Sequence, residues 1–364
     1  MTVMHLVRKK GKNRQPVILG CVCMCFLLCF LCNAELTSTC IRRGLRLCAQ
    51  TVIPSLFPCM VLAEILIASG FGEWLGRLLA RPMQKVFGIS GASSSAVLLG
   101  ALCGFPIGTR AALALYKRGS IDRGELEHLL TFCNNTSIAF TVSAVGNSLY
   151  GSQAFGVGLC CIQLFCALLI GILGRRRGMH PSSVSRAEEP AVRLDVILTQ
   201  AISGSALAML YICAYVVFFS ALVGIMDDVL LQKCGIQIPP GLLFGLFELS
   251  SGVSAAASEP LMLGAVLCAF TVGWSGAAVH CQIFSLLAQE KVSLRPYLAA
   301  KILQGILCAA LTFLWLSFCP PADLRPTGTV PVFSPLPSAY LLWSNLLFLA
   351  ALLLPKCRKK QKIR

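Results

Sequence analysis

The sequence predicts an all-α, polytopic integral membrane protein built from two inverted repeats, each with a broken helix or re-entrant hairpin, and with flanking spans at both ends. Composition points to this fold class, because 56% of the 364 residues are apolar and the mean hydropathy is +0.77. Only 13% of the residues are charged, about half the share in a soluble globular protein. The basic residues also gather at the chain ends and in one connector, as the cytoplasmic flanks of membrane spans do.

The placement of charge speaks against a nucleic-acid partner. The net charge is +16, but five basic residues stand in the first 15 positions, five between Arg175 and Arg193, and six in the last nine. A folded soluble domain could not hide this much apolar surface without exposing large patches. We therefore expect the lipid bilayer around the chain, and neither a soluble enzyme nor a nucleic-acid-binding module.

Residues 1–50 are expected to hold a basic N-terminus, a first span and an amphipathic segment. A basic stretch precedes an apolar run over 17–32, which is interpreted as an uncleaved span with its N-terminus in the cytoplasm. A cleaved secretory signal is the alternative. Residues 40–52 are expected to form an amphipathic helix on the outer surface, because they carry Arg42, Arg43 and Arg46.

Residues 51–175 are expected to form the first membrane repeat, whose main feature is a break between two short apolar runs. The break reads Gly104-Phe105-Pro106-Ile107-Gly108, and proline disrupts a helix interior while glycine offers no side chain against bending. A hairpin over 92–116 leaves three crossings and places Arg175-Arg176-Arg177 inside, whereas one kinked span would place these arginines outside. The hairpin is therefore preferred, with crossings at 52–70, 129–150 and 153–174.

An interfacial helix is expected over Gly72–Phe87, where Arg77, Arg81 and Lys85 recur along one side. It would lie along the membrane surface between the first crossing of this repeat and the hairpin.

A cytoplasmic linker over 176–195 leads to the second repeat, 196–319, which has its own break at Gly273-Trp274-Ser275-Gly276. Leu99-Gly100-Ala101 and Leu263-Gly264-Ala265 precede the two breaks and suggest an internal repeat. With an odd number of crossings each, the two units would be inverted, as is common in secondary transporters. Residues 320–364 hold a last span, 339–354, and a basic tail, so both termini are expected in the cytoplasm.

Polar residues at membrane depth are the candidate site, because they are costly there. Arg110 stands at the start of a half-helix, where free amide groups and a guanidinium suit a carboxylate; the alternative is an arginine that reaches the interface. Glu64 could pair with Arg110, carry a coupling proton or line the cavity. The polar run Asn134-Asn135-Thr136-Ser137 indicates a site, with interhelical hydrogen bonding as the alternative.

The second half adds Glu248, and His280 with Gln282 after its break. His280 could couple protons, but a packing role is the more frequent one for a lone histidine. No metal, cofactor or catalytic motif is recognised, and the 20 cysteines lie mostly in apolar runs as small side chains. The full set of candidate substrate-binding residues is Gly104, Pro106, Gly108, Arg110, Asn134, Asn135, Ser137, Glu64, Glu248, His280 and Gln282.

Four segments resemble the sporulation integral membrane protein YlbJ family, which belongs to the wider group with nucleoside-recognition, or Gate, domains. They are IPSLFPCMVLAEILIASGFG (53–72), LLGALCGFPIGTRAALALYKRG (98–119), LLTFCNNTSIAFTVSAVG (129–146) and VGWSGAAVHCQIFSLL (272–287). The resemblance covers roughly 45–318. It implies a membrane protein of the sporulating cell, placed between mother cell and forespore, that moves dipicolinate, a small aromatic dicarboxylate. By resemblance the motif positions are Gly104, Pro106, Gly108, Arg110, Asn134, Asn135 and Ser137.

The favoured hypothesis is a transporter or facilitator of a small, dipicolinate-like organic anion that works by alternating access between two inverted halves. A non-transporting membrane scaffold for spore assembly and a transporter of a nucleoside-like solute are the alternatives. A homo-oligomer is left open.

Overall fold

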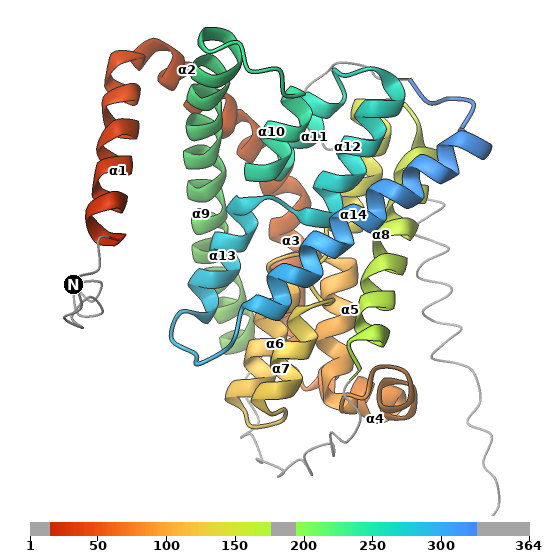
Figure 1. Ribbon diagram of the computed structural model, residues 1–364. Coiled ribbons are helices and arrows are strands. Elements are labelled where there is room, and N and C mark those ends of the chain that lie inside the picture. The colour runs from red at the N-terminus through yellow and green to blue at the C-terminus, as the bar shows by residue number, and fades with distance from the viewer. Residues whose placement is uncertain (1–14, 176–193, 326–364) are drawn as a thin grey trace, which may run out of the picture.

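The computed structural model describes residues 15–175 and 194–325, and within these ranges all regular structure is helical (Figure 1). Five helices of the described part are long and apolar enough to cross a membrane: Ala34–Ala68, Gln153–Leu173, Asp195–Lys233, Leu261–Leu287 and Arg295–Phe318. The predicted all-α, polytopic fold class is therefore confirmed. The linker 176–193 and the last span, predicted at 339–354, lie outside the described residues.

The N-terminal part forms a layer against α9 (Leu194–Met226). The apolar helix α1 (Gln15–Cys32) stands at the edge, and α2 (Ala34–Leu47), η1 (Cys48–Val52) and α3 (Ile53–Ala68) run on as one 35-residue helix along α9 (Figure 1). The amphipathic segment predicted over 40–52 is helical, but it runs on into α3 as part of this helix, and its place on the outer surface stays a prediction. Gly44 lets α2 approach α9 closely, since a Cβ there would stand 3.1 Å from Val217 Cα, and the three arginines lie on the exposed side.

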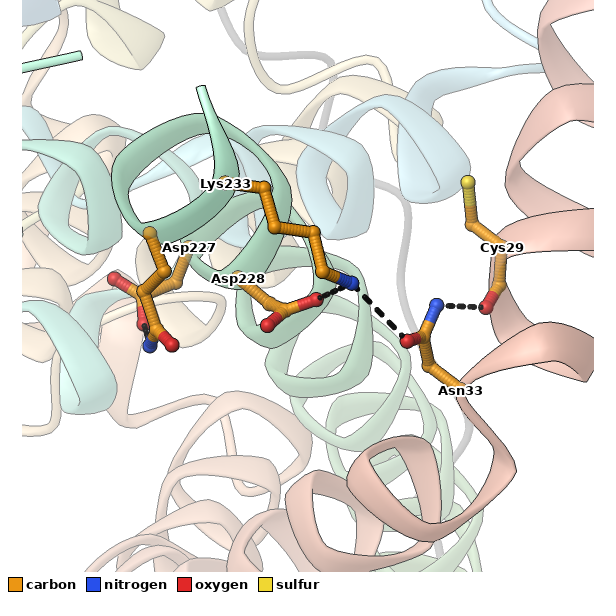
Figure 2. Close-up of polar contacts among 6 residues, drawn as sticks. Cys29, Asn33, Asp227, Asp228 and Lys233 are labelled. Atoms are coloured by element: carbon orange, nitrogen blue, oxygen red, sulfur yellow. Dashed lines mark hydrogen bonds and ion pairs between the residues drawn. The ribbon is translucent and has the colours of Figure 1, made fainter. Parts of the chain in front are cut away.

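One polar cluster joins the α1–α2 turn to η5 (Asp227–Lys233), which continues α9. Figure 2 shows that Asn33 Nδ2 donates to Cys29 O at 3.0 Å, and that Lys233 Nζ donates to Asn33 Oδ1 at 3.4 Å and pairs with Asp228 Oδ2 at 2.6 Å. The end of α1, the start of α2 and the end of α9 therefore lie together. This is the upper end of the molecule in Figure 1.

The expected interfacial segment is helical, as α4 (Phe71–Pro82) and η2 (Met83–Phe87). Its basic side chains Arg77, Arg81 and Lys85 are exposed, and the helix bends by 100° into the segment that follows. Its place on a membrane surface stays a prediction.

The hairpin predicted over 92–116 is present as η3 (Gly91–Ser93) with α5 (Ser94–Leu102) and α6 (Ile107–Lys117), which pack side by side. A Cβ at Gly100 or at Gly108 would overlap the carbonyl oxygen of Cys133, so both glycines allow the hairpin to close against the segment behind it. Both ends of the hairpin lie near α7 (Arg123–Leu130). Glu125 of α7 accepts hydrogen bonds from the Ser90 amide (2.7 Å), the Ser90 hydroxyl (2.6 Å) and the Ser93 hydroxyl.

The crossing predicted over 129–150 is not one helix. It consists of α7, an irregular segment over 131–137 and η4 (Phe140–Leu149), followed by α8 (Gln153–Leu173). The prediction that the polar run continues a helix is wrong. Asn134 Nδ2 donates to Leu130 O and Asn135 Nδ2 donates to Phe132 O, and such local bonds compete with the helical pattern.

The second half contains a hairpin that was not predicted. Helices α10 (Pro240–Phe247) and α11 (Leu249–Ala256) fold against each other around Glu248, and a Cβ at Gly252 would collide with Gly245 Cα. The predicted break at 273–276 is present between α12 (Leu261–Trp274) and α13 (Ala277–Leu287). There Ser275 and Gly276 take left-handed φ values of 80° and 81°, and the two helices continue as one broken span.

The two halves share one order of elements: a hairpin, a broken crossing and a long helix. The first half has α5–α6, α7–η4 and α8, and the second has α10–α11, α12–α13 and α14 (Arg295–Phe318). The Leu-Gly-Ala match does not relate equivalent elements, because Gly100 belongs to a hairpin and Gly264 to a crossing.

Contacts between loops establish the direction of each crossing. Lys117 pairs with Glu290 at 3.5 Å, and the Ser293 amide donates to Glu127 at 2.8 Å, so the α6–α7 turn meets the α13–α14 loop at the lower end (Figure 1). At the opposite end the Ser152 hydroxyl donates to Asp323 at 2.7 Å, which joins the η4–α8 turn to the end of α14. The α5–α6 hairpin therefore comes from the lower end, and α10–α11 lies at the upper end (Figure 1).

Candidate functional site

The helix breaks of the two halves meet in the middle of the protein. The Phe105 amide donates to Asn135 O at 2.8 Å, which joins the first hairpin to the 131–137 segment. The Thr136 hydroxyl donates to Val272 O at 3.2 Å, near the break that follows α12. A Cβ on Gly276 would stand 3.1 Å from the Glu248 nitrogen, so that break touches the tip of the second hairpin.

The segment 131–137, called the hub below, is held by three different elements through three consecutive carbonyl groups. Asn134 O accepts from Lys301 Nζ of α14 at 2.9 Å, Asn135 O from the Phe105 amide, and Thr136 O from Gln163 Nε2 of α8 at 3.0 Å. In a helix, backbone amides of the same helix would donate to these carbonyl groups. In the hub, donors from neighbouring segments do so, because buried backbone groups need hydrogen-bond partners.

The side chains of Asn134 and Asn135 both form hydrogen bonds within the protein. The Thr109 hydroxyl donates to Asn134 Oδ1 at 2.7 Å, and Gln304 Nε2 donates to Asn135 Oδ1 at 3.0 Å. The alternative that the sequence left for these residues was interhelical hydrogen bonding; here a non-helical segment makes such bonds to α6 and α14. The asparagines hold the hub in place, and the next residues, Thr136 and Ser137, face the central pocket.

The central pocket lies between the breaks and the helices α3 and α9. Its cavity volume is about 40 Å³, and its apolar walls come from α3, η4, α9, α11 and α13. Three predicted site residues, Ser137, Glu248 and Gln282, line it. The polar lining as a whole is Ser55, Thr136, Ser137, Glu248, Ser250 and Gln282.

Backbone groups give the pocket part of its electrostatic character. Helix α13 starts at the pocket, with Ala278 and Val279 in the lining, and its first residues have no side-chain cap. An uncapped helix start carries partial positive charge that favours anions. Helix α11 differs, because Glu248 accepts from the Ser250 amide at 2.9 Å and the Ser251 amide at 2.6 Å.

Arg110 of α6 and Glu64 of α3 form an ion pair outside the pocket lining. Their closest atoms, Arg110 Nη2 and Glu64 Oε1, are 2.6 Å apart, and the side chains are 20% and 27% exposed. The pairing was one of the three roles considered for Glu64. Neither side chain belongs to the pocket lining, so in this state the guanidinium already has a carboxylate partner.

His280 packs against aromatic rings behind the pocket. Its Nδ1 lies 2.7 Å from the Tyr297 hydroxyl, and its ring centroid lies 4.2 Å from that of Trp274. It is buried and does not line the pocket. Of the remaining predicted residues, Gly104 touches the hub, Pro106 immediately precedes α6, and Gly108 packs against Cys133.

Lys301 was missed from the sequence although it stands inside an apolar run. It is only 1% exposed, and its Nζ donates to Asn134 O and, at 2.8 Å, to Gln304 Oε1. Gln304 and Gln163 extend the network to Asn135 and Thr136. Glu64 was selected from the sequence because a charged side chain at membrane depth is costly, and the same argument applies to this lysine.

Two comparisons with known proteins bear on this arrangement. Residues 49–153 match the family model described as Gate, nucleoside recognition. The chain is 26% identical over 310 residues to the sporulation integral membrane protein YlbJ of Bacillus subtilis (strain 168), which covers 75% of this chain and 76% of that protein. The resemblance to the YlbJ family is confirmed. No solved structure matches the chain.

The match to the Gate model spans the first half of the site. It contains α3, the first hairpin, the hub and η4, and so both the Glu64–Arg110 pair and the hub residues. Glu248, Gln282 and Lys301 lie beyond it. The similarity to YlbJ and the membrane-spanning helices together describe a multi-pass membrane protein of transporter-like type.

Proposed function

We propose that this protein is a membrane transporter of a small organic anion, dipicolinate, in the sporulating cell. The observation that carries the proposal is the meeting of four helix breaks around a largely apolar pocket that has a few polar side chains in its lining. Broken helices at membrane depth are stable only where protein or a water-filled cavity satisfies the backbone, and in transporters such breaks form substrate sites. The sporulation role is taken from the name of the relative YlbJ.

The chemistry of the pocket supports an aromatic anion. Its apolar walls suit a ring, while hydroxyl and amide groups from Ser137 and Gln282 can donate to carboxylate oxygens. The uncapped start of α13 adds partial positive charge at the same place.

The size of the pocket and the path of the chain support alternating access. A cavity of about 40 Å³ holds roughly three water molecules, so a dicarboxylate enters only when surrounding elements move. The two hairpins come from opposite ends, which supports two inverted repeats that open in turn. The termini are proposed to be cytoplasmic, and the membrane is proposed to be that between mother cell and forespore.

Uptake of labelled dipicolinate by proteoliposomes tests the proposal. We expect saturable uptake by the wild type and a loss of at least about tenfold in Gln282→Ala, because its amide lines the pocket. Gln289→Ala is the matched control, since Gln289 is exposed in the α13–α14 loop. Equal uptake by both variants would remove the pocket from the transport path.

A nucleoside-like solute is the second candidate substrate. Two observations favour it: the match to the nucleoside-recognition model and the Glu248 carboxylate in the pocket, which can accept hydrogen bonds from sugar hydroxyls. Unlabelled competitors separate the candidates in the same assay. Competition by nucleosides but not by dicarboxylates supports the second candidate, and no uptake of either by folded protein supports a scaffold.

A further inference from the structure

A buried lysine stands behind the wall of the central pocket and is not paired with an acidic residue in the described part of the chain. Lys301 is 1% exposed, and its two hydrogen-bond partners, Asn134 O and Gln304 Oε1, are neutral. Within residues 15–175 and 194–325 it forms no ion pair. A buried charge without a partner is costly, and at membrane depth it marks function by default.

The position of Lys301 couples it to the pocket through a single short segment. Its ammonium binds Asn134 O, and two and three residues later Thr136 and Ser137 line the pocket. Gln304 connects the same ammonium to Asn135. In an interior of low dielectric constant, a charge acts over a longer distance than it does in water, so an ammonium behind the hub can act on a charge in the pocket.

The carboxylate of Glu248 already has hydrogen-bond donors in the protein. Both of its oxygens accept backbone amides of α11, from Ser250 and Ser251, and that helix start offsets its charge. Lys301 also has two neutral hydrogen-bond partners, but it stands inside α14 and not at a helix end, so no helix terminus offsets its charge. Among the residues described around the hub, its ammonium is therefore a charge that can balance a ligand in the pocket.

We propose that Lys301 sets the charge specificity of the pocket: from behind the hub it balances the negative charge of a bound anion without touching it. This rests on the proposed function and deepens it, because it names the residue that distinguishes an anion from a neutral molecule of the same shape. Lys301 is a positioning residue in this scheme, and the direct contacts come from Ser137, Gln282 and the α13 amides.

Binding of three pyridines of similar shape tests this inference: pyridine-2,6-dicarboxylate, pyridine-2-carboxylate and the neutral pyridine-2,6-dicarboxamide. Affinity is measured from the ligand-dependent rise in Tm of the purified full-length protein. In Lys301→Gln we expect dicarboxylate affinity to fall about tenfold, monocarboxylate affinity less, and dicarboxamide affinity to stay unchanged. Lys301→Arg should keep the wild-type order of the three ligands.

Two further variants keep the test decisive. Lys291→Gln removes an exposed lysine in the α13–α14 loop and should leave all three affinities unchanged. Lys301→Met replaces the charge by an apolar side chain of similar volume, which buried sites often tolerate, and serves if Lys301→Gln does not fold.

Three outcomes overturn the inference. Equal loss of all three ligands in Lys301→Gln and Lys301→Met would mean that the lysine only shapes the hub. Wild-type dicarboxylate affinity in either variant would mean that its charge does not reach the ligand, while the proposed function still stands. Failure of the wild type to bind either carboxylate would overturn the proposed function together with this inference.

Discussion

At the scale of single residues, the ion pair between Glu64 and Arg110 links α3 to the first hairpin. Arg110→Gln leaves Glu64 without a partner next to the hairpin, so we expect a loss of about 1–2 kcal/mol of stability, a value reduced for the partial exposure of both side chains. Glu64→Gln together with Arg110→Gln should recover part of this loss, because no charge is left unpaired. The Tm values of the single and double variants measure the coupling.

The double variant distinguishes a stabilising ion pair from a role of Arg110 alone. A double variant as unstable as Arg110→Gln would contradict a stabilising pair and indicate that Arg110 acts alone. Uptake by a stable double variant would show that neither charge is needed to bind substrate.

Single residues also show which parts of the site can be predicted from the sequence. Polar residues inside apolar runs identify Glu64, Arg110 and Asn134, because their cost at membrane depth is a property of the residue itself. None of these three lines the pocket; Thr136 and Ser137 do, because the backbone at 131–137 is not helical, and that conformation arises from contacts with α8 and α14. Lys301 is also a charged residue inside an apolar run, so it could have been identified from the sequence by the same argument.

At the scale of elements, glycines on either side of a break allow each hairpin to close. In Gly100→Ala the new Cβ would overlap Cys133 O of the hub, and neither backbone can shift freely. We expect a loss of about 1–3 kcal/mol, seen as a lower Tm. Gly20→Ala is the matched control, since nothing lies within 4 Å of that position in α1. Equal Tm values for the two variants would contradict the tight closure.

The two hairpins differ in how well the sequence indicates them. The first has a proline between Gly104 and Gly108, and the charge of its flanks favours a return to the same side. The second has neither signal, because Glu248 alone ends α10 and caps α11. The sequence of the second hairpin does contain two glycines, Gly245 and Gly252, on either side of a polar residue. Their similarity to Gly100 and Gly108 of the first hairpin can be recognised only from the contacts in the structure.

At the scale of the whole molecule, the loops of the lower end are rich in basic residues. The lower end in Figure 1 carries Lys117 and Arg118 at the α6–α7 turn and Lys291 and Arg295 at the α13–α14 loop, with Lys117 paired to Glu290. At the upper end Lys233 is paired with Asp228, and the exposed Arg42, Arg43 and Arg46 lie further along α2. Cytoplasmic loops of membrane proteins are enriched in lysine and arginine. The lower end should therefore face the cytoplasm, with the first hairpin opening inward and the second outward.

Epitope insertions at two open turns test this orientation. Gly119 follows α6 at the lower end and Gly235 follows η5 at the upper end, and nothing lies within 4 Å of either position. An antibody should bind the Gly235 insertion on intact spheroplasts and the Gly119 insertion only on inverted vesicles. The reverse result would change the orientation but keep the path of the chain. Access to both sites from one face would contradict two hairpins that come from opposite sides, and alternating access between inverted halves would lose its structural basis.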